Sequence, residues 1–218
     1  VYWLVNHDPL TGLFNQSRFF NELSRSIQEL RKYERDGVLA IVDIDQFKLI
    51  NSQYNNSVGD FYLNHITKIL KSKMSKGDIL ARITSDKFAI LFPEKTIKDV
   101  DDILKNIVAE VFDNKMTYNN SSISATVSIG YVNFPEHAKT SAELFRKAEV
   151  ATTRAKEKGR NRIHLFNPEE HNDSVIANGL ELIDFISDCL ENDRVALYYQ
   201  PIVLLSDTKH IARYEVLM

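Results

Sequence analysis

Two short apolar runs, residues 79–83 and 89–93, flank residues 84–88, which read Thr-Ser-Asp-Lys-Phe. Apolar runs of this length joined by a polar segment predict a strand, a tight turn and a second strand. We therefore expect an antiparallel hairpin over residues 79–93. The fold must include this hairpin, so the remaining elements have to be arranged around it.

The rest of the chain alternates between helical and strand-like patterns. Four helices are predicted by apolar residues at helical spacing, over residues 15–35, 59–70, 97–112 and 141–158. Strands are predicted over residues 38–44, 123–134 and 162–166, and residues 118–122 form a polar loop. Alternating strands and helices around a central hairpin predict an α/β (α+β) fold with mixed strand directions.

Composition limits the classes of function. A length of 218 residues suits one domain with part of a second. The net charge of −3 gives no electrostatic basis for binding nucleic acid or a membrane surface. A single cysteine excludes an internal disulfide and favours a reducing cytoplasm. Because the sequence does not begin with Met, we expect a cytoplasmic fragment of a longer protein, with any membrane anchor outside it.

Four motifs occur in order along residues 6–166. They are Asp-Pro-Leu-Thr-Gly-Leu at 8–13, Asp-Ile-Asp-Gln-Phe-Lys at 43–48, Val-Ser-Ile-Gly at 127–130 and Ala-Lys-Glu-Lys-Gly-Arg-Asn-Arg at 155–162. Together they resemble the GGDEF family, the bacterial diguanylate cyclases that join two GTP molecules into cyclic di-GMP. The resemblance implies a ferredoxin-like palm, shared with adenylyl cyclases, in which helices flank a central, mainly antiparallel sheet.

The resemblance also implies a metal site. It places Asp43, the backbone carbonyl of Ile44 and Asp86 on a Mg²⁺ ion that accompanies GTP. Phosphoryl transfer needs such an ion to neutralise the triphosphate, and Mg²⁺ favours a few hard oxygens together with phosphate. The simpler interpretation is that these acids only cap the end of a strand.

Five further residues match nucleotide-binding positions of the family. Asn51 and Asp60 match the pair that contacts the guanine edge, which an amide and a carboxylate together can recognise. Lys48, Lys156 and Arg160 match phosphate-contacting positions. Each has a structural alternative, because Asp60 also suits the first turn of a helix and a lone lysine is usually just solvated.

The signature turn departs from the family pattern Gly-Gly-Asp/Glu-Glu-Phe, of which only Asp86 and Phe88 are kept. Thr84 and Ser85 replace glycines that let the backbone approach phosphates. Lys87 replaces a glutamate that is implicated in metal binding or in activating the 3′-hydroxyl, and it reverses the charge. We therefore expect no functional catalytic residue here. Alternatively, Lys87 pairs with a phosphate and allows GTP to bind with little metal.

A second departure concerns feedback. The family's product-inhibition site has the pattern Arg-x-x-Asp just before the signature, whereas residues 75–78 read Ser-Lys-Gly-Asp. Without the arginine, we expect no binding of cyclic di-GMP at that position.

The character of the chain changes after residue 166. We expect a helical linker over residues 167–192 and, over residues 193–218, the start of a second domain. Tyr-Gln-Pro-Ile at 199–202 and Glu-Val-Leu at 215–217 resemble the opening strands of an EAL domain, the cyclic di-GMP phosphodiesterase barrel. The resemblance makes Glu215 a metal ligand only in a complete domain, and a (β/α)₈ barrel needs about 250 residues.

The sequence thus predicts a degenerate GGDEF domain, residues 1–166, that binds GTP and regulates an adjoining EAL phosphodiesterase or receptor domain. The expected partners are GTP, this EAL domain and a second copy of the chain, and the only cofactor predicted is Mg²⁺ together with GTP. One alternative is an interaction or dimerisation scaffold without nucleotide. Another is a residual diguanylate cyclase, so the sequence leaves open whether the chain is an enzyme.

Overall fold

The computed structural model describes residues 3–119, 121–135, 140–169, 198–204 and 207–217. The chain divides into two compact units, Val1–His171 and Asn172–Met218. In the second unit, β8 (Tyr198–Leu204) and β9 (Asp207–Leu217) form an antiparallel hairpin. The predicted linker helix lies outside the described residues from position 170 onward.

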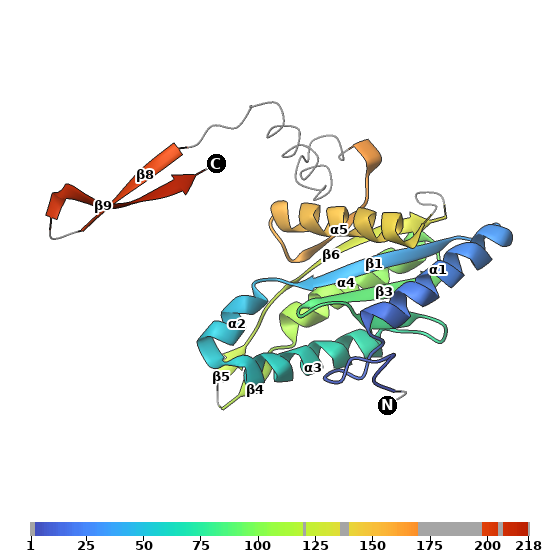
Figure 1. The fold of residues 1–218 in the computed structure, drawn as a ribbon. Helices are drawn as coiled ribbons and strands as arrows, with labels where there is room; N and C mark the ends of the chain where they lie inside the picture. Colours follow the sequence, from blue (N-terminus) through green and yellow to red (C-terminus); the bar gives the residue numbers. More distant parts are fainter. Residues whose placement is uncertain (1–2, 120, 136–139, 170–197, 205–206, 218) are drawn as a thin grey trace, which may run out of the picture. The chain divides into compact units, whose positions relative to one another are not determined.

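A five-stranded sheet forms the centre of the first unit (Figure 1). Its strands, in spatial order, are β2 (Ile79–Arg82), β3 (Lys87–Pro93), β1 (Gly37–Ile44), β6 (Val127–Phe134) and β7 (Arg162–Leu165). All neighbours are antiparallel except β6 and β7, which are parallel. The predicted hairpin over 79–93 and the mainly antiparallel sheet are therefore confirmed.

Helices cover both faces of this sheet (Figure 1). On one face, α1 (Gln16–Lys32) and α5 (Ser141–Glu157) contact the strands and each other. On the other face, α3 (Asn56–Ser72) and α4 (Ile97–Asp113) cover the apolar core formed with β1. Among the described residues, no helix has both the length and the apolar character needed to cross a bilayer.

Successive residues of β1 face opposite sides of the sheet, as in any strand. Val38, Ala40 and Val42 belong to the core cluster shared with α3 and α4. Asp43 has the opposite parity and faces α5, where its side chain contacts Lys156. The alternation therefore places one buried carboxylate at the end of the strand, on the α5 side.

The observed elements differ from the sequence-based prediction mainly between residues 47 and 127. A short helix, α2 (Phe47–Tyr54), was not predicted, and α3 begins at Asn56 rather than at residue 59. The strand expected from residue 123 begins at Val127. The expected polar loop contributes to a small hairpin of β4 (Met116–Tyr118) and β5 (Ser121–Ile123).

Candidate functional site

The site begins with two opposite charges at neighbouring strand ends. Asp43 on β1 and Lys87 on β3 are directly paired across the antiparallel ladder. Residues opposite each other in such a ladder project to the same face of the sheet. Both side chains therefore extend toward α5, and Asp43 is buried with an exposed fraction of only 2%.

Helix α5 supplies a partner for each of these charges. Glu149 and Lys156 are seven residues apart, which is about two helical turns, so they lie on one side of the helix. Between them, Thr152 packs directly on Gly130 of β6, where a Cβ would lie 2.0 Å from the Thr152 backbone nitrogen. Because residue 130 is glycine, α5 lies close enough to the sheet for both charged side chains to reach the strand ends.

Two ion pairs result. The Lys156 ammonium lies 2.7 Å from Asp43 Oδ1, and the Lys87 ammonium donates a 2.8 Å hydrogen bond to Glu149 Oε1. Burial raises the pKa of the Asp43 carboxyl, and this outweighs the opposite effect of Lys156. Burial alone would lower the pKa of Lys87, but Glu149, together with Asp43 and Asp86, raises the pKa overall. Lys87 is therefore protonated at neutral pH.

The Arg82 side chain holds the signature turn in place through hydrogen bonds. Its guanidinium donates to the backbone carbonyls of Thr84 (3.2 Å) and Ser85 (2.8 Å) and to the carboxylate of Asp8. Among the described non-glycine residues with positive φ, none belongs to this turn. Thr84 and Ser85 therefore replace glycines without left-handed backbone strain. Both residues are exposed, and Phe88 is fully buried in the core.

The three predicted metal-binding positions lie next to one another. The Ile44 N–H donates a 3.1 Å hydrogen bond to the backbone carbonyl of Asp86, which draws the turn against the end of β1. The Asp86 carboxylate accepts a 2.8 Å hydrogen bond from Ser85.

This donor set does not fit a Mg²⁺ ion, which is bound through one or two available carboxylates together with substrate phosphates. Lys156 already neutralises Asp43, and the Lys87 ammonium lies on the same face. Within the part of the chain that the structure describes, histidine, cysteine, aspartate and glutamate side chains form no group of three able to hold a metal ion.

Asn51 and Asp60 come from adjacent helices, α2 and α3. A Cβ on Gly59 would lie 1.9 Å from Asn51 Oδ1, so the asparagine packs directly beside the residue that precedes Asp60. Asn51 Oδ1 is buried and has no hydrogen-bond partner among the described residues. Asp60 and Lys48 are exposed. The predicted guanine-binding pair is thus close together, with one acceptor left unsatisfied.

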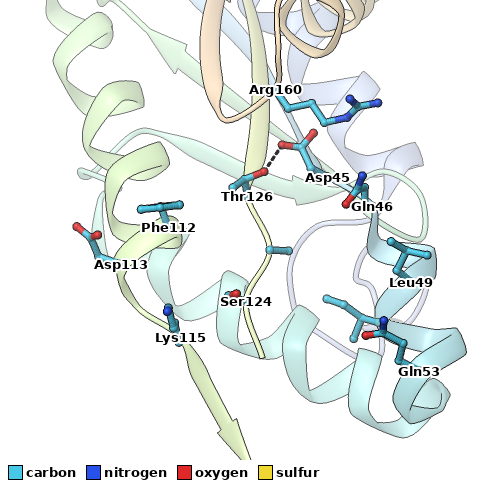
Figure 2. Close-up of a pocket in the computed structure, with 12 residues that line it drawn as sticks. Asp45, Gln46, Leu49, Gln53, Phe112, Asp113, Lys115, Ser124, Thr126 and Arg160 are labelled. Atoms are coloured by element: carbon cyan, nitrogen blue, oxygen red, sulfur yellow. Dashed lines mark hydrogen bonds between the residues drawn. The ribbon is translucent and has the colours of Figure 1, made fainter. Parts of the chain in front are cut away.

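Arg160 lines a cavity whose lining residues include neither Lys48 nor Lys156. The cavity has a volume of about 530 Å³ and is also lined by Asp45, Gln46 and Phe112 (Figure 2). On α2, this cavity is lined by Leu49 and Gln53, which occupy a different side of the helix from Lys48 and Asn51.

Asp45, two residues after Asp43, has a structural role. Its carboxylate accepts hydrogen bonds from the hydroxyls of Thr126 (2.6 Å) and Ser128 (2.8 Å). These bonds join the end of β1 to the start of β6. The Asp45 carboxylate is therefore occupied by hydrogen bonds within the protein, although Asp45 lies in the same motif as Asp43.

Asp78, the residue kept from the feedback pattern, is also used internally. Its carboxylate accepts hydrogen bonds from the Ser75 backbone N–H (2.7 Å) and the Lys95 ammonium (2.8 Å). The side chain is 2% exposed. The aspartate therefore closes its own turn, which explains its presence without a feedback ligand.

Glu149 is the residue of this site that the sequence did not reveal. A single glutamate on an amphipathic helix gives no functional signal, and its partner Lys87 is 62 positions away. The only available hint was its seven-residue spacing from Lys156.

Comparisons with known proteins agree on one family. The family model for the GGDEF domain of diguanylate cyclases matches residues 5–162. The chain is similar to cyclic di-GMP phosphodiesterase PdeB of Shewanella oneidensis, at 30% identity over 98% of this chain and 24% of that protein. It is similar to diguanylate cyclase TpbB of Pseudomonas aeruginosa, at 31% identity over 72% of this chain and 36% of that protein. The chain thus spans well under half the length of either relative.

Solved structures give the same result for the fold. The GGDEF domain of DgcB from Caulobacter crescentus, determined in complex with c-di-GMP, has a TM-score of 0.72 and 26% identity, covering 75% of this chain and 94% of that one. The GGDEF domain of TpbB from Pseudomonas aeruginosa has a TM-score of 0.73 and 30% identity, covering 76% and 97%. These likenesses confirm the predicted fold class.

Proposed function

This chain belongs to the GGDEF family of diguanylate cyclase domains, and from that premise we propose that it is a GTP-binding regulatory domain of cyclic di-GMP signalling without cyclase activity. The observation that carries the proposal is the ion pair between Lys87 and Glu149. The family signature has a glutamate at position 87, which can bind a metal or accept a proton. A protonated lysine has only donors to offer and can do neither.

Retained nucleotide binding is supported by Asn51. A buried acceptor without a partner costs about 1–3 kcal/mol, and a ligand donor would recover that cost. The guanine edge carries N–H donors that suit this oxygen and the exposed carboxylate of Asp60. Lys48 and Arg160 are exposed, and Lys156 lies at the strand end, so all three remain our candidates for phosphate contacts.

The regulated partner is proposed from the second unit. We propose that residues 1–166 form the degenerate GGDEF domain, residues 167–192 a linker and residues 193–218 the start of a cytoplasmic EAL domain. PdeB, a named phosphodiesterase, matches nearly the whole chain and so includes the β8–β9 region. Glu215, which pairs with Gln200 in the β8–β9 ladder, would be a metal ligand of the complete domain. GTP would act by changing the equilibrium of that domain, which is allosteric coupling.

A residual diguanylate cyclase is the second candidate. The observation that favours it is the sequence similarity to TpbB, which is named as a diguanylate cyclase and is 31% identical over the GGDEF region. The reversed charge at Lys87 argues against it, because losing a metal ligand or base removes several orders of magnitude in rate at about 1.4 kcal/mol per tenfold.

Two measurements on the 218-residue chain test the proposal. Calorimetric titration should show GTP binding with a dissociation constant of micromolar order, and ATP should fail to reproduce it. Chromatography after incubation with GTP and Mg²⁺ should detect no cyclic di-GMP. Product from the unmodified chain would establish the residual cyclase instead, and the absence of any GTP binding would favour the scaffold alternative, including a homodimer.

A variant that carries Thr84→Gly, Ser85→Gly and Lys87→Glu tests how local the loss is. We expect this triple variant to form cyclic di-GMP at a detectable rate, because Asp43, Asp86, Asn51 and Asp60 keep the residue types of the family pattern. The pair Thr84→Gly and Ser85→Gly alone is the matched control and should stay inactive. Equal and detectable activity of the two variants would show that Lys87 is not the cause of the loss. A silent triple variant would show that the damage extends beyond the signature turn.

A further inference from the structure

The charges around the end of β1 are unusual for a site that loads a metal ion. Three acids, Asp43, Asp86 and Glu149, surround two ammonium groups, those of Lys87 and Lys156. Replacing a glutamate by a lysine at position 87 raises the local charge by two units, which equals the charge of one Mg²⁺ ion. The substitution thus supplies, as part of the chain, the positive charge that the metal would bring.

We infer that this site binds the triphosphate of GTP without a divalent cation, and that Lys87 leaves Glu149 to pair with the phosphates. The inference rests on the proposed function, since it concerns the same nucleotide site. It assigns a role to Glu149, which holds Lys87 while no nucleotide is bound.

The two ion pairs differ in how readily they can open. The Asp43 side chain is 3% exposed, so its carboxylate needs a permanent counter-charge, and Lys156 provides it. The Lys87 and Glu149 side chains are 34% and 41% exposed. An ion pair this accessible to water contributes little to stability and can exchange partners at small cost. Lys87 is therefore the cation that can move, whereas Lys156 stays at Asp43.

A triphosphate is the kind of ligand that would draw Lys87 away. It carries more negative charge than one carboxylate, and hydrogen bonds between ammonium and phosphate are among the strong, charge-assisted kind. Lys156 has three donor positions, so it can contact a phosphate while it remains bonded to Asp43. A Mg²⁺ ion at the same point would be repelled by both ammonium groups.

A purely structural role for the Lys87–Glu149 pair predicts a different outcome. If the pair only ties the hairpin to α5, its loss should leave GTP affinity unchanged or weaken it. If Glu149 competes with the triphosphate for Lys87, Glu149→Gln should tighten GTP binding. The direction of this change separates the two roles.

The test is calorimetric titration of GTP into the 218-residue chain, once with EDTA and once with excess Mg²⁺. We expect binding in EDTA and no gain in affinity from Mg²⁺. In EDTA, Lys87→Met should weaken binding at least about tenfold, as expected for a charge-assisted contact, and Glu149→Gln should tighten it about threefold. Lys87→Glu should make binding depend on Mg²⁺.

Lys73 and Glu110 provide the matched control. They form another ion pair between separate segments, with side-chain exposures of 30% and 33%, close to those of the Lys87–Glu149 pair. Lys73→Met and Glu110→Gln should leave GTP affinity unchanged in both buffers. Thermal unfolding of each variant verifies that it is folded, and if Lys87→Met fails to fold, Glu149→Gln and the two buffers still decide.

Each outcome is decisive. GTP binding that requires Mg²⁺ in the unmodified chain would overturn the metal-free inference and leave the proposed function standing. Binding in neither buffer would overturn both. Unchanged affinity in a folded Lys87→Met variant, or unchanged or weaker binding in Glu149→Gln, would show that the pair has a structural role only.

Discussion

Asp8 joins the start of the chain to the signature turn through a few hydrogen bonds. Its carboxylate accepts from the Thr11 N–H (2.9 Å) and hydroxyl (2.6 Å) and from the Arg82 guanidinium. Burial alone would raise the pKa of Asp8, but the bonds from Thr11 and Arg82 lower the pKa below its usual value. A pKa lowered by folding adds stability that is present above the unfolded-state pKa and lost as pH falls through the folded-state pKa.

Asp8→Asn should therefore lower the free energy of unfolding at pH 7 by about 2 kcal/mol, as expected for hydrogen bonds to a charged group. The difference from the unmodified chain should shrink below about pH 4, the range in which an unfolded aspartate becomes protonated. Urea unfolding at several pH values measures both effects. Asp102→Asn on the exposed side of α4 is the control and should change little. A difference that does not vary with pH would contradict this account.

The close contact between α5 and β6 determines the geometry of the site at the scale of elements. A Cβ on residue 130 would lie 2.0 Å from the Thr152 backbone nitrogen and 2.4 Å from the Ala148 carbonyl oxygen. Gly130→Ala must push α5 away from the sheet and should cost about 3 kcal/mol. Because Glu149 and Lys156 move with the helix, GTP affinity should fall as well.

Denaturant unfolding and GTP titration of Gly130→Ala measure the two effects. Gly77→Ala is the comparison, because no atom lies within 4 Å of its Cβ position and only its φ of 102° is unfavourable. That variant should cost about 1 kcal/mol and leave GTP affinity intact. Equal costs for the two variants would show that the α5 contact is not tightly packed.

Elements with long apolar stripes could be predicted from the sequence, and short ones could not. The predictions for α1, α4 and α5 come within three residues of the observed ends because each buries a long stripe of side chains. In α2, only Phe47 and Ile50 are buried. Its N-cap, Gln46, is left-handed and makes no side-chain cap bond, and Asn55 joins α2 to α3 at φ 125°. The start of α2 thus lacks the usual signals of a helix boundary, and the one cap bond nearby, from the Val58 N–H to the Asn55 side chain, belongs to α3.

For the site, the sequence could identify candidate residues, but it could not show which side chains pair with one another. The Asp43 motif and the hairpin turn were recognisable, and the strand register does bring Asp43 opposite Lys87. That Glu149 would hold Lys87 depends on how closely α5 approaches the sheet. This approach is fixed by Gly130 and Thr152 on different elements, so no local pattern encodes it.

At the scale of the whole molecule, GTP binding and folding of the first unit must be linked. A ligand that binds only the folded state stabilises it by about 2.7 kcal/mol at one hundred times its dissociation constant. We therefore expect GTP at that concentration to raise the unfolding temperature of the unit Val1–His171 in calorimetric scans, and ATP to leave it unchanged. Equal shifts with GTP and ATP would contradict guanine recognition by Asn51 and Asp60. The same free energy is the upper limit on how far GTP binding can shift a conformational equilibrium of an adjoining domain. The reason is that a ligand shifts an equilibrium only by its difference in affinity for the two states.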